Sequence, residues 1–470
     1  MRKISWLVLR RFCLMGLAGM LAVLPGTLQN PGDSAVGTGT AAWLERFAQA
    51  AESREFEHFA QAAESREFEH FAQAEPREWE CFAQASGTQD LELSARTLTA
   101  ADLQPGASYF EYQWALSNDG RLRRTPPSPG APGSLSYEAV FFPGGFYAVW
   151  GSGYRSVSAQ AGVDIDVQTA WQFYNSTPER RTVTVALIDT GVDVTHPELQ
   201  NAVWVNADEI PGDGIDNDGN GYIDDINGWN FCDGTPVVTA GEGEDNATHG
   251  AGTIAGSWDG TGIMGIADGA YVKIMVLKTM AGTDGLGNSE NVKAAIRYAQ
   301  ANGADIVNLS LGTDTYDPEL ESLIQNSPML FVASAGNGDS LGAGYNVDFS
   351  PVFPASYQAD NLISVANLMF DGTLEESSNY GMFSVDLAAP GTYILSAVPG
   401  GYGFMSGTSM SAPMVTGTAA LIYSCRTDLS LMDVKQAILN TARPLDGLSG
   451  LVGTGGMLDA GAAIQYQKAQ

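Results

Sequence analysis

Positive charge is scarce in this chain. Its 470 residues include only 23 Lys and Arg against 54 Asp and Glu, a formal net charge of −31. Such a surface repels nucleic acids and anionic membranes, so we expect neither as a partner. Carboxylates in loops are instead suited to hard cations such as Ca²⁺.

Long hydrophobic runs are also nearly absent. The one notable run covers residues 12–24 and follows four basic residues at positions 2, 3, 10 and 11. It is too short to span a bilayer comfortably, but it suits the apolar part of an export signal. We therefore predict a signal peptide at 1–30 and a secreted or extracellular protein, held at the cell surface if this segment is not cleaved. No other membrane contact is expected.

Cysteine and histidine are few. Four cysteines form no disulfide framework, and both a Cys232–Cys425 bridge and two free thiols remain open. Two of the four histidines lie in short repeats, which leaves His196 and His249 as candidates for imidazole chemistry.

The first third of the chain is organised differently from the rest. Residues 47–58, FAQAAESREFEH, recur unchanged at 59–70, and partial copies extend to residue 85. A period of 12 fits neither stacked solenoid repeats nor a sustained helical stripe, so we interpret 31–107 as a spacer or pro-segment. A docking segment or a self-processed peptide remains an alternative. Residues 108–160, with a basic Pro- and Gly-rich loop at 121–134, are predicted to extend a larger domain at 161–470.

From about residue 161 the pattern alternates between strands and helices. The apolar run 183–189 is typical of a buried parallel strand, and a helix capped by Ser289 is predicted to end near Gly303. Strands at 305–312 and 329–337 and a buried helix over 412–423 follow. This alternation predicts an α/β fold with a parallel sheet covered by helices on both faces. Sites in such sheets lie beyond the carboxyl ends of the strands, where Asp189 and Asn337 fall.

Three segments carry candidate chemistry. A serine nucleophile needs a base within hydrogen-bond reach, and the base needs an acceptor that fixes its tautomer. Ser409 lies in GTSMSAP before an apolar helix, His249 lies in DNATHGAGTIAG, and Asp189 lies in LIDTGVD. Taken singly, each has an ordinary structural interpretation, such as an N-cap serine or a turn aspartate.

Together and in this order, DTGVDVTHPEL, THGAGTIAG and GTSMSAPMVTGTAALI resemble the signatures of the subtilase family of subtilisin-like serine proteases. The resemblance includes AAIRYAQANGADIVNLSLG and VASAGNG and covers about 161–465. QWALSNDG at 113–120 is similar to the start of many secreted subtilase domains. The resemblance implies a three-layer subtilisin-like fold, with Ser409 as the nucleophile, His249 as the base, Asp189 orienting that base and Asn337 in the oxyanion hole.

The same resemblance implies how substrate is held. Residues Ser310, Leu311 and Gly312 would pair with an extended substrate backbone, and Ser334, Ala335 and Gly336 would form the wall beside the scissile bond. We therefore expect a monomeric, secreted serine endopeptidase that cleaves extended protein or peptide substrates through an acyl-enzyme on Ser409. The alternatives are a subtilase-fold peptide ligase or macrocyclase, a processing protease specific for one partner, and an inactive binding protein.

The histidine segment departs from the family pattern. The family usually has HGTHVAGT, whereas this chain has NATHGAGT, so Asn246 and Ala247 replace the usual His-Gly and Gly250 stands where Val is common. Because His249 and its small neighbours are present, we expect activity to survive.

An acidic loop between Asp189 and His249 is a candidate metal site. DNDGNGYIDDIN offers oxygen ligands at Asp216, Asp218 and Asn220, like the opening of a Ca²⁺ loop. The twelfth position is Asn rather than Glu, so the bidentate ligand is expected from Asp224 or its neighbour Asp225. A structural Ca²⁺ is the prediction, and a solvated acidic turn is the alternative.

Overall fold

The computed structural model describes residues 108–120, 159–282, 285–338 and 343–468. The predicted signal peptide, the repeats and the basic loop at 121–134 lie outside the described residues. None of the helices in the described ranges is both long and apolar enough to span a bilayer.

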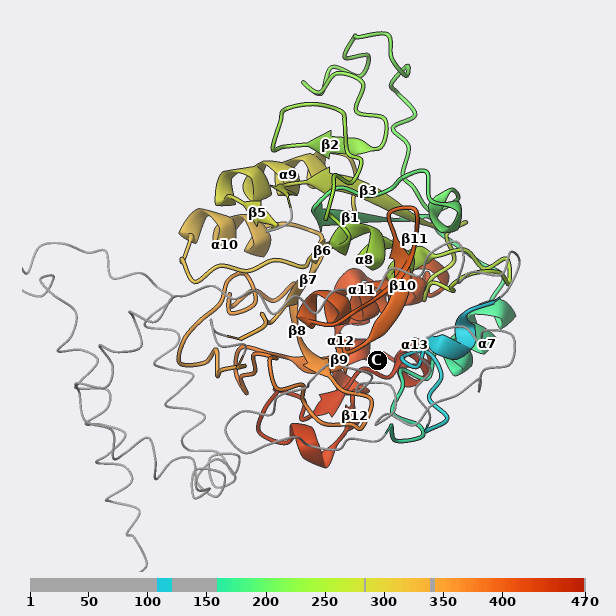
Figure 1. The fold of residues 1–470 in the computed structure, drawn as a ribbon, viewed down its shortest axis with the longest axis vertical. Helices are drawn as coiled ribbons and strands as arrows, with labels where there is room; N and C mark the ends of the chain where they lie inside the picture. Colours follow the sequence, from blue (N-terminus) through green and yellow to red (C-terminus); the bar gives the residue numbers. More distant parts are fainter. Residues whose placement is uncertain (1–107, 121–158, 283–284, 339–342, 469–470) are drawn as a thin grey trace, which may run out of the picture. The chain divides into compact units, whose positions relative to one another are not determined.

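A nine-stranded sheet forms the centre of the fold (Figure 1). Its order is β12-β13-β9-β8-β7-β6-β1-β3-β2, and every neighbouring pair is parallel except β12 and β13. The strands are β1 Val183–Asp189, β2 Gly228–Asn230, β3 Val272–Lys278, β6 Ile306–Leu309, β7 Leu330–Ser334, β8 Leu362–Leu368, β9 Leu387–Pro390, β12 Arg443–Pro444 and β13 Gly456–Met457. Two antiparallel hairpins lie outside the sheet, formed by β10 Ile394–Val398 with β11 Gly401–Met405 and by β4 Met280–Ala281 with β5 Leu286–Gly287.

Helices cover both faces of the sheet. Because side chains alternate along a strand, Val185 and Leu187 of β1 face one layer while Ala186 and Ile188 face the other. The first layer contains α8 and α11, and the second contains α9 and α10, which lie on the other side of the strands in Figure 1. The helices are α7 Val167–Ser176, α8 Asn246–Ala255, α9 Ser289–Ala301, α10 Pro318–Gln325, α11 Thr408–Cys425, α12 Leu431–Asn440 and α13 Ala460–Ile464. The predicted α/β architecture is confirmed.

Local details differ from the sequence predictions. The side chain of Asn288, not that of Ser289, accepts the capping hydrogen bond of α9, from the backbone N–H of Asn291. The Ser289 hydroxyl instead donates to the carboxylate of Asp317, which itself caps α10. Strands β6 and β7 are shorter than predicted, so residues 310–312 and 335–337 lie beyond the sheet. Cys232 and Cys425 are both free thiols.

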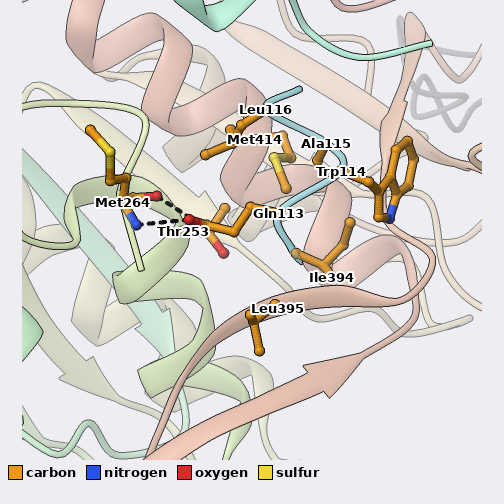
Figure 2. Close-up of a pocket in the computed structure, with 9 residues that line it drawn as sticks. All are labelled: Gln113, Trp114, Ala115, Leu116, Thr253, Met264, Ile394, Leu395 and Met414. Carbon is orange, nitrogen blue, oxygen red and sulfur yellow. Dashed lines mark hydrogen bonds between the residues drawn. The ribbon is translucent and has the colours of Figure 1, made fainter. Parts of the chain in front are cut away.

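The segment at 108–120 packs against α8, β10 and α11. The Trp114 indole N–H donates to the carbonyl of Thr392 at 3.0 Å, and the Gln113 side chain makes two hydrogen bonds with the backbone of Met264. Figure 2 shows a small pocket between this segment, Thr253 of α8, Ile394 of β10 and Met414 of α11. The segment therefore covers the flank of α8 that faces β10.

Candidate active site

The carboxyl edge of the sheet gathers the predicted residues. Asp189 ends β1, Ser310 directly follows β6 and Ser334 ends β7. Since parallel strands end at the same edge, these side chains lie on neighbouring loops. Helix α11 begins there too, because the Ser310 hydroxyl donates to the backbone carbonyl of Ser409 at 3.2 Å.

Ser409 is the second residue of α11 and is half-buried. Within the described ranges its hydroxyl makes a single long contact, 3.5 Å, with the carbonyl of Ser310. A hydrogen bond of that length is weak, so the hydroxyl can turn toward a substrate. The helix N-terminus also places the positive end of the helix dipole beside it. Ser409 thus lies where a serine nucleophile is useful.

Thr408 holds the Asn337 side chain beside Ser409. Its side-chain oxygen accepts hydrogen bonds from the Thr408 backbone N–H at 2.7 Å and from the Thr408 hydroxyl at 2.8 Å. These hydrogen bonds fix the orientation of the Asn337 amide. Its side-chain nitrogen can still donate, and the residue is exposed. Gly407 keeps the approach open, since a Cβ there would lie 3.2 Å from that nitrogen. The arrangement suits an oxyanion hole.

The two predicted substrate-binding segments lie on either side of this pair. Ser310 is buried, whereas Leu311 and Gly312 are at least partly exposed and extend beyond β6. On the other side Ser334 and Ala335 are buried, and the Gly336 backbone N–H donates to the Thr408 hydroxyl at 3.2 Å. A side chain at 336 would be strained, because its φ is +96°.

Asp189 is only 1% exposed. One carboxylate oxygen accepts the Thr190 backbone N–H at 2.6 Å, while the other, Oδ2, is buried and accepts no hydrogen bond from the described residues. Burial raises the pKa of Asp189 to about 7. The second oxygen is the acceptor to which the ring N–H of a histidine base would donate.

His249 does not lie against that oxygen. Its ring is fully buried, and Nε2 lies 2.8 Å from the carbonyl oxygen of Ile394 in β10. A carbonyl only accepts, so Nε2 carries the proton and the free lone pair is on Nδ1, which is buried without a partner among the described residues. Burial also lowers the pKa of His249 to about 4.

The described part of the chain contains no hydrogen bond that joins His249 to Asp189 or to Ser409. The expected Asp189–His249–Ser409 chain of hydrogen bonds is therefore not present, because the His249 ring faces β10 and the flank covered by residues 108–120. This corrects the expectation that His249 faces the nucleophile. Asp189, Asn337 and Ser409 do occupy the predicted edge.

A buried ion pair organises the loops around Asp189. Glu244 accepts from the Lys278 ammonium at 2.7 Å, and both side chains are less than a tenth exposed. The same carboxylate accepts backbone N–H groups from three loop glycines, Gly191, Gly241 and Gly282. Nothing in the sequence patterns indicated this pair, since the partners are 34 residues apart.

The acidic loop gathers a different set of carboxylates from the one predicted. Asp216 and Asp218 approach Glu209, with one oxygen of each within 4.8 Å of the others. Asp224 is not among them, since its carboxylate accepts the backbone N–H groups of Gly212 and Gly214. The Asn220 side-chain oxygen accepts the Tyr222 N–H. Glu209 was missed because it precedes the loop motif.

Comparison with known proteins agrees with the fold. The model of the subtilase family matches residues 180–455. The chain is 34% identical over 284 residues to the major intracellular serine protease of Bacillus subtilis, covering 58% of this chain and 80% of that protein. It is 31% identical over 292 residues to subtilisin BL of Lederbergia lenta, covering 60% and 91%. Subtilisin-like protease 1 of Plasmodium berghei is 31% identical over 333 residues, 66% of this chain but only 54% of that protein. With the family model matching more than half of its length, the chain belongs to the subtilase family of serine-type endopeptidases.

Proposed function

We propose that this protein is a secreted endopeptidase that binds extended protein segments at the carboxyl edge of its sheet and attacks their peptide bonds with Ser409. The observation that carries the proposal is the placement of Ser409 at the start of α11, beside the fixed amide of Asn337. Family membership supports protein substrates.

Substrate would bind as an added strand. Leu311 and Gly312 follow the end of β6 and are at least partly exposed. Ala335 and Gly336 follow the end of β7. An extended peptide would form main-chain hydrogen bonds to Leu311 and Gly312, which gives affinity without demanding a particular sequence. Ala335 and Gly336, whose backbone N–H groups already donate to Val365 and Thr408, would instead form the wall beside the scissile bond. The scissile carbonyl then lies near Ser409.

Three events at Ser409 follow from this placement. The hydroxyl oxygen attacks the scissile carbonyl carbon, and the carbonyl oxygen gains negative charge. The Asn337 amide and the Ser409 backbone N–H would donate to that oxygen, and each such donor is worth about 10²–10³ in turnover. The hydroxyl proton must pass to a base and then to the amine, which leaves as the peptide C–N bond breaks, and water then releases the acyl group from Ser409.

The geometry of His249 favours a second candidate, a protein that binds extended segments but turns them over slowly. Its ring makes its hydrogen bond to Ile394 and none to Ser409. Binding and oxyanion stabilisation alone still accelerate the reaction over water by about 10³–10⁴. The two candidates share the binding site and differ only in rate.

The test compares the purified protein with Ser409→Ala. An unstructured protein is incubated with each, the new ends are identified by mass spectrometry, and Ser409 is probed with a fluorophosphonate. Products and labelling that disappear in Ser409→Ala support the proposal. Products unaffected by Ser409→Ala would refute it. Addition of a peptide amine as a competing nucleophile separates hydrolysis from ligation, because only ligation yields joined products.

Calcium binding is proposed at the acidic loop. Glu209, Asp216 and Asp218 supply carboxylate oxygens close together, which is the donor chemistry that Ca²⁺ prefers. The ion would hold the loop together and take no part in the reaction. After a chelator has removed bound metal, we expect added Ca²⁺ to raise the melting temperature of the wild type. The same addition should not raise the melting temperature of Glu209→Gln. An equal response of both proteins would refute the site.

Export is proposed from the basic and apolar segment at 1–30. The expected result is protein in the culture medium whose first residue lies downstream of this segment. Recovery of the intact N-terminus from the cytoplasm would contradict it.

A further inference from the structure

Helices α8 and α11 lie side by side and run in the same direction. A Cβ on Gly250 of α8 would lie 3.4 Å from the ring of Pro413 in α11, and a Cβ on Gly417 would lie 3.3 Å from Cα of Ile254. The contacting positions are four residues apart on both helices, so the two helices keep one register. One turn nearer their starts, the same register sets Asn246 opposite Ser409.

Strand β1 gives the same result from a second direction. The Gly250 Cβ position is also 3.9 Å from the side chain of Leu187. Asp189 lies two residues further along the strand, about 6.6 Å, and Asn246 lies four residues back along the helix, about 6 Å. Both displacements lead to the carboxyl edge of the sheet, so Asp189 and Asn246 lie at the same level there.

Thr190 connects these two positions by hydrogen bonds. Its backbone N–H donates to Asp189, and its hydroxyl accepts the backbone N–H of Ala247 at 3.4 Å. The side-chain oxygen of Asn246 and Oδ2 of Asp189 are both buried, and neither accepts a hydrogen bond among the described residues. The asparagine amide carries N–H donors as well as this oxygen, so position 246 is one from which a side chain can donate to the aspartate.

We infer that position 246, not 249, is the place from which a base can serve Ser409, and that the asparagine there leaves the nucleophile without one. A carboxamide takes up no proton at neutral pH. The protein therefore binds extended segments but cleaves them slowly. A histidine at 246 would convert it into a fast peptidase. This inference rests on the proposed role of Ser409 as nucleophile.

The buried ring of His249 fits this assignment. His249 lies one turn further into α8 than the edge, and its own backbone carbonyl accepts the hydroxyls of Thr253 and Ser396. It thus joins α8 to β10 and has a structural role. Asn246, by contrast, is partly exposed at the edge of the site.

The expected gain is large. Loss of the base alone lowers kcat about 10⁶-fold in subtilisin, a member of the same family. The new imidazole need not be ideally oriented to give a measurable gain. We expect Asn246→His to raise kcat and the rate of fluorophosphonate labelling by at least about 10³-fold. The rate should rise with pH through an imidazole pKa, which a structural effect of the substitution would not produce.

The experiment uses the full chain in four forms: wild type, Asn246→His, the size-matched Asn246→Gln, and Asn246→His combined with Ser409→Ala. Circular dichroism melting confirms that each is folded. A gain in Asn246→His that is absent from Asn246→Gln and abolished by Ser409→Ala supports the inference. Asn246→His no faster than Asn246→Gln, while Ser409-dependent cleavage by the wild type is retained, overturns the inference and leaves the proposed function standing.

His249→Gln supplies a second arm. If the wild type turns over rapidly and His249→Gln abolishes its turnover without lowering its melting temperature, position 249 is the base and the inference is overturned. If no form labels at Ser409, the proposed function fails, and the inference fails with it.

Discussion

Asp189 should destabilise the folded protein at neutral pH. Burial raises its pKa from 3.8 to about 7, and Oδ2 has no hydrogen-bond donor among the described residues. Between these two pH values the folded state keeps a proton that the unfolded state releases, so stability is fully present below pH 3.8 and is lost as the pH rises to about 7. We therefore predict that Asp189→Asn stabilises the protein above pH 7.

The size of the effect follows from the same shift. A pKa difference of about three units corresponds to about 4 kcal/mol at most. The amide retains an oxygen to accept the Thr190 N–H, but its buried N–H groups also need partners, which costs about 1–3 kcal/mol. We expect a net gain of about 1–3 kcal/mol at pH 8, or several degrees in melting temperature, and no gain below pH 4.

The measurement is thermal unfolding of Asp189→Asn at pH 4, 6 and 8, with Ser409→Ala in both proteins to prevent self-digestion. Asp259→Asn is the matched control. The Asp259 carboxylate is exposed, and hydrogen bonds from Thr261 lower its pKa, so its replacement should destabilise at pH 8. If the difference between Asp189→Asn and its parent is the same at all three pH values, the reasoning from burial is refuted.

Three further substitutions test packing, charge and the oxyanion site. Gly250→Ala should stabilise the protein by about 0.5–1 kcal/mol, because its Cβ would meet only ordinary van der Waals contacts. Gly252→Ala should destabilise it, because its Cβ would lie 2.6 Å from a serine hydroxyl. Urea unfolding measures both variants, and equal effects on stability would contradict the packing. Lys278→Met leaves Glu244 buried and unpaired and should cost about 3–5 kcal/mol, and an unchanged unfolding midpoint would contradict this. Asn337→Ala in the Asn246→His protein should lower kcat about 10²–10³-fold with little change in KM, and an unchanged kcat would remove Asn337 from the oxyanion hole.

The sequence predicted the scaffold well because its elements have strong local patterns. The apolar run at 183–189 could only be a buried strand, and β1 has those bounds. The capping of α9 was assigned one residue too late, since Asn288 and Ser289 are both good caps and only the neighbouring Asp317 decides between them.

The candidate site was only partly predictable. Ser409 and Asn337 come together because each follows a strand or opens a helix at the same edge, and such positions can be read from the alternation of elements. Glu209 could not be found in this way, since it joins Asp216 and Asp218 through the folding of the loop rather than through a motif.

By itself, the sequence determined that a serine nucleophile, an aspartate and a parallel sheet occur in this chain, because short motifs and apolar periodicity are local properties. The tertiary structure decided which side chain of α8 faces Ser409. Residues 246 and 249 are separated on a helix by about 60° around the axis and about 4.5 Å along it. That small difference sets one at the edge of the site and buries the other against β10, and only the packing of α8 on α11 and β1 reveals it.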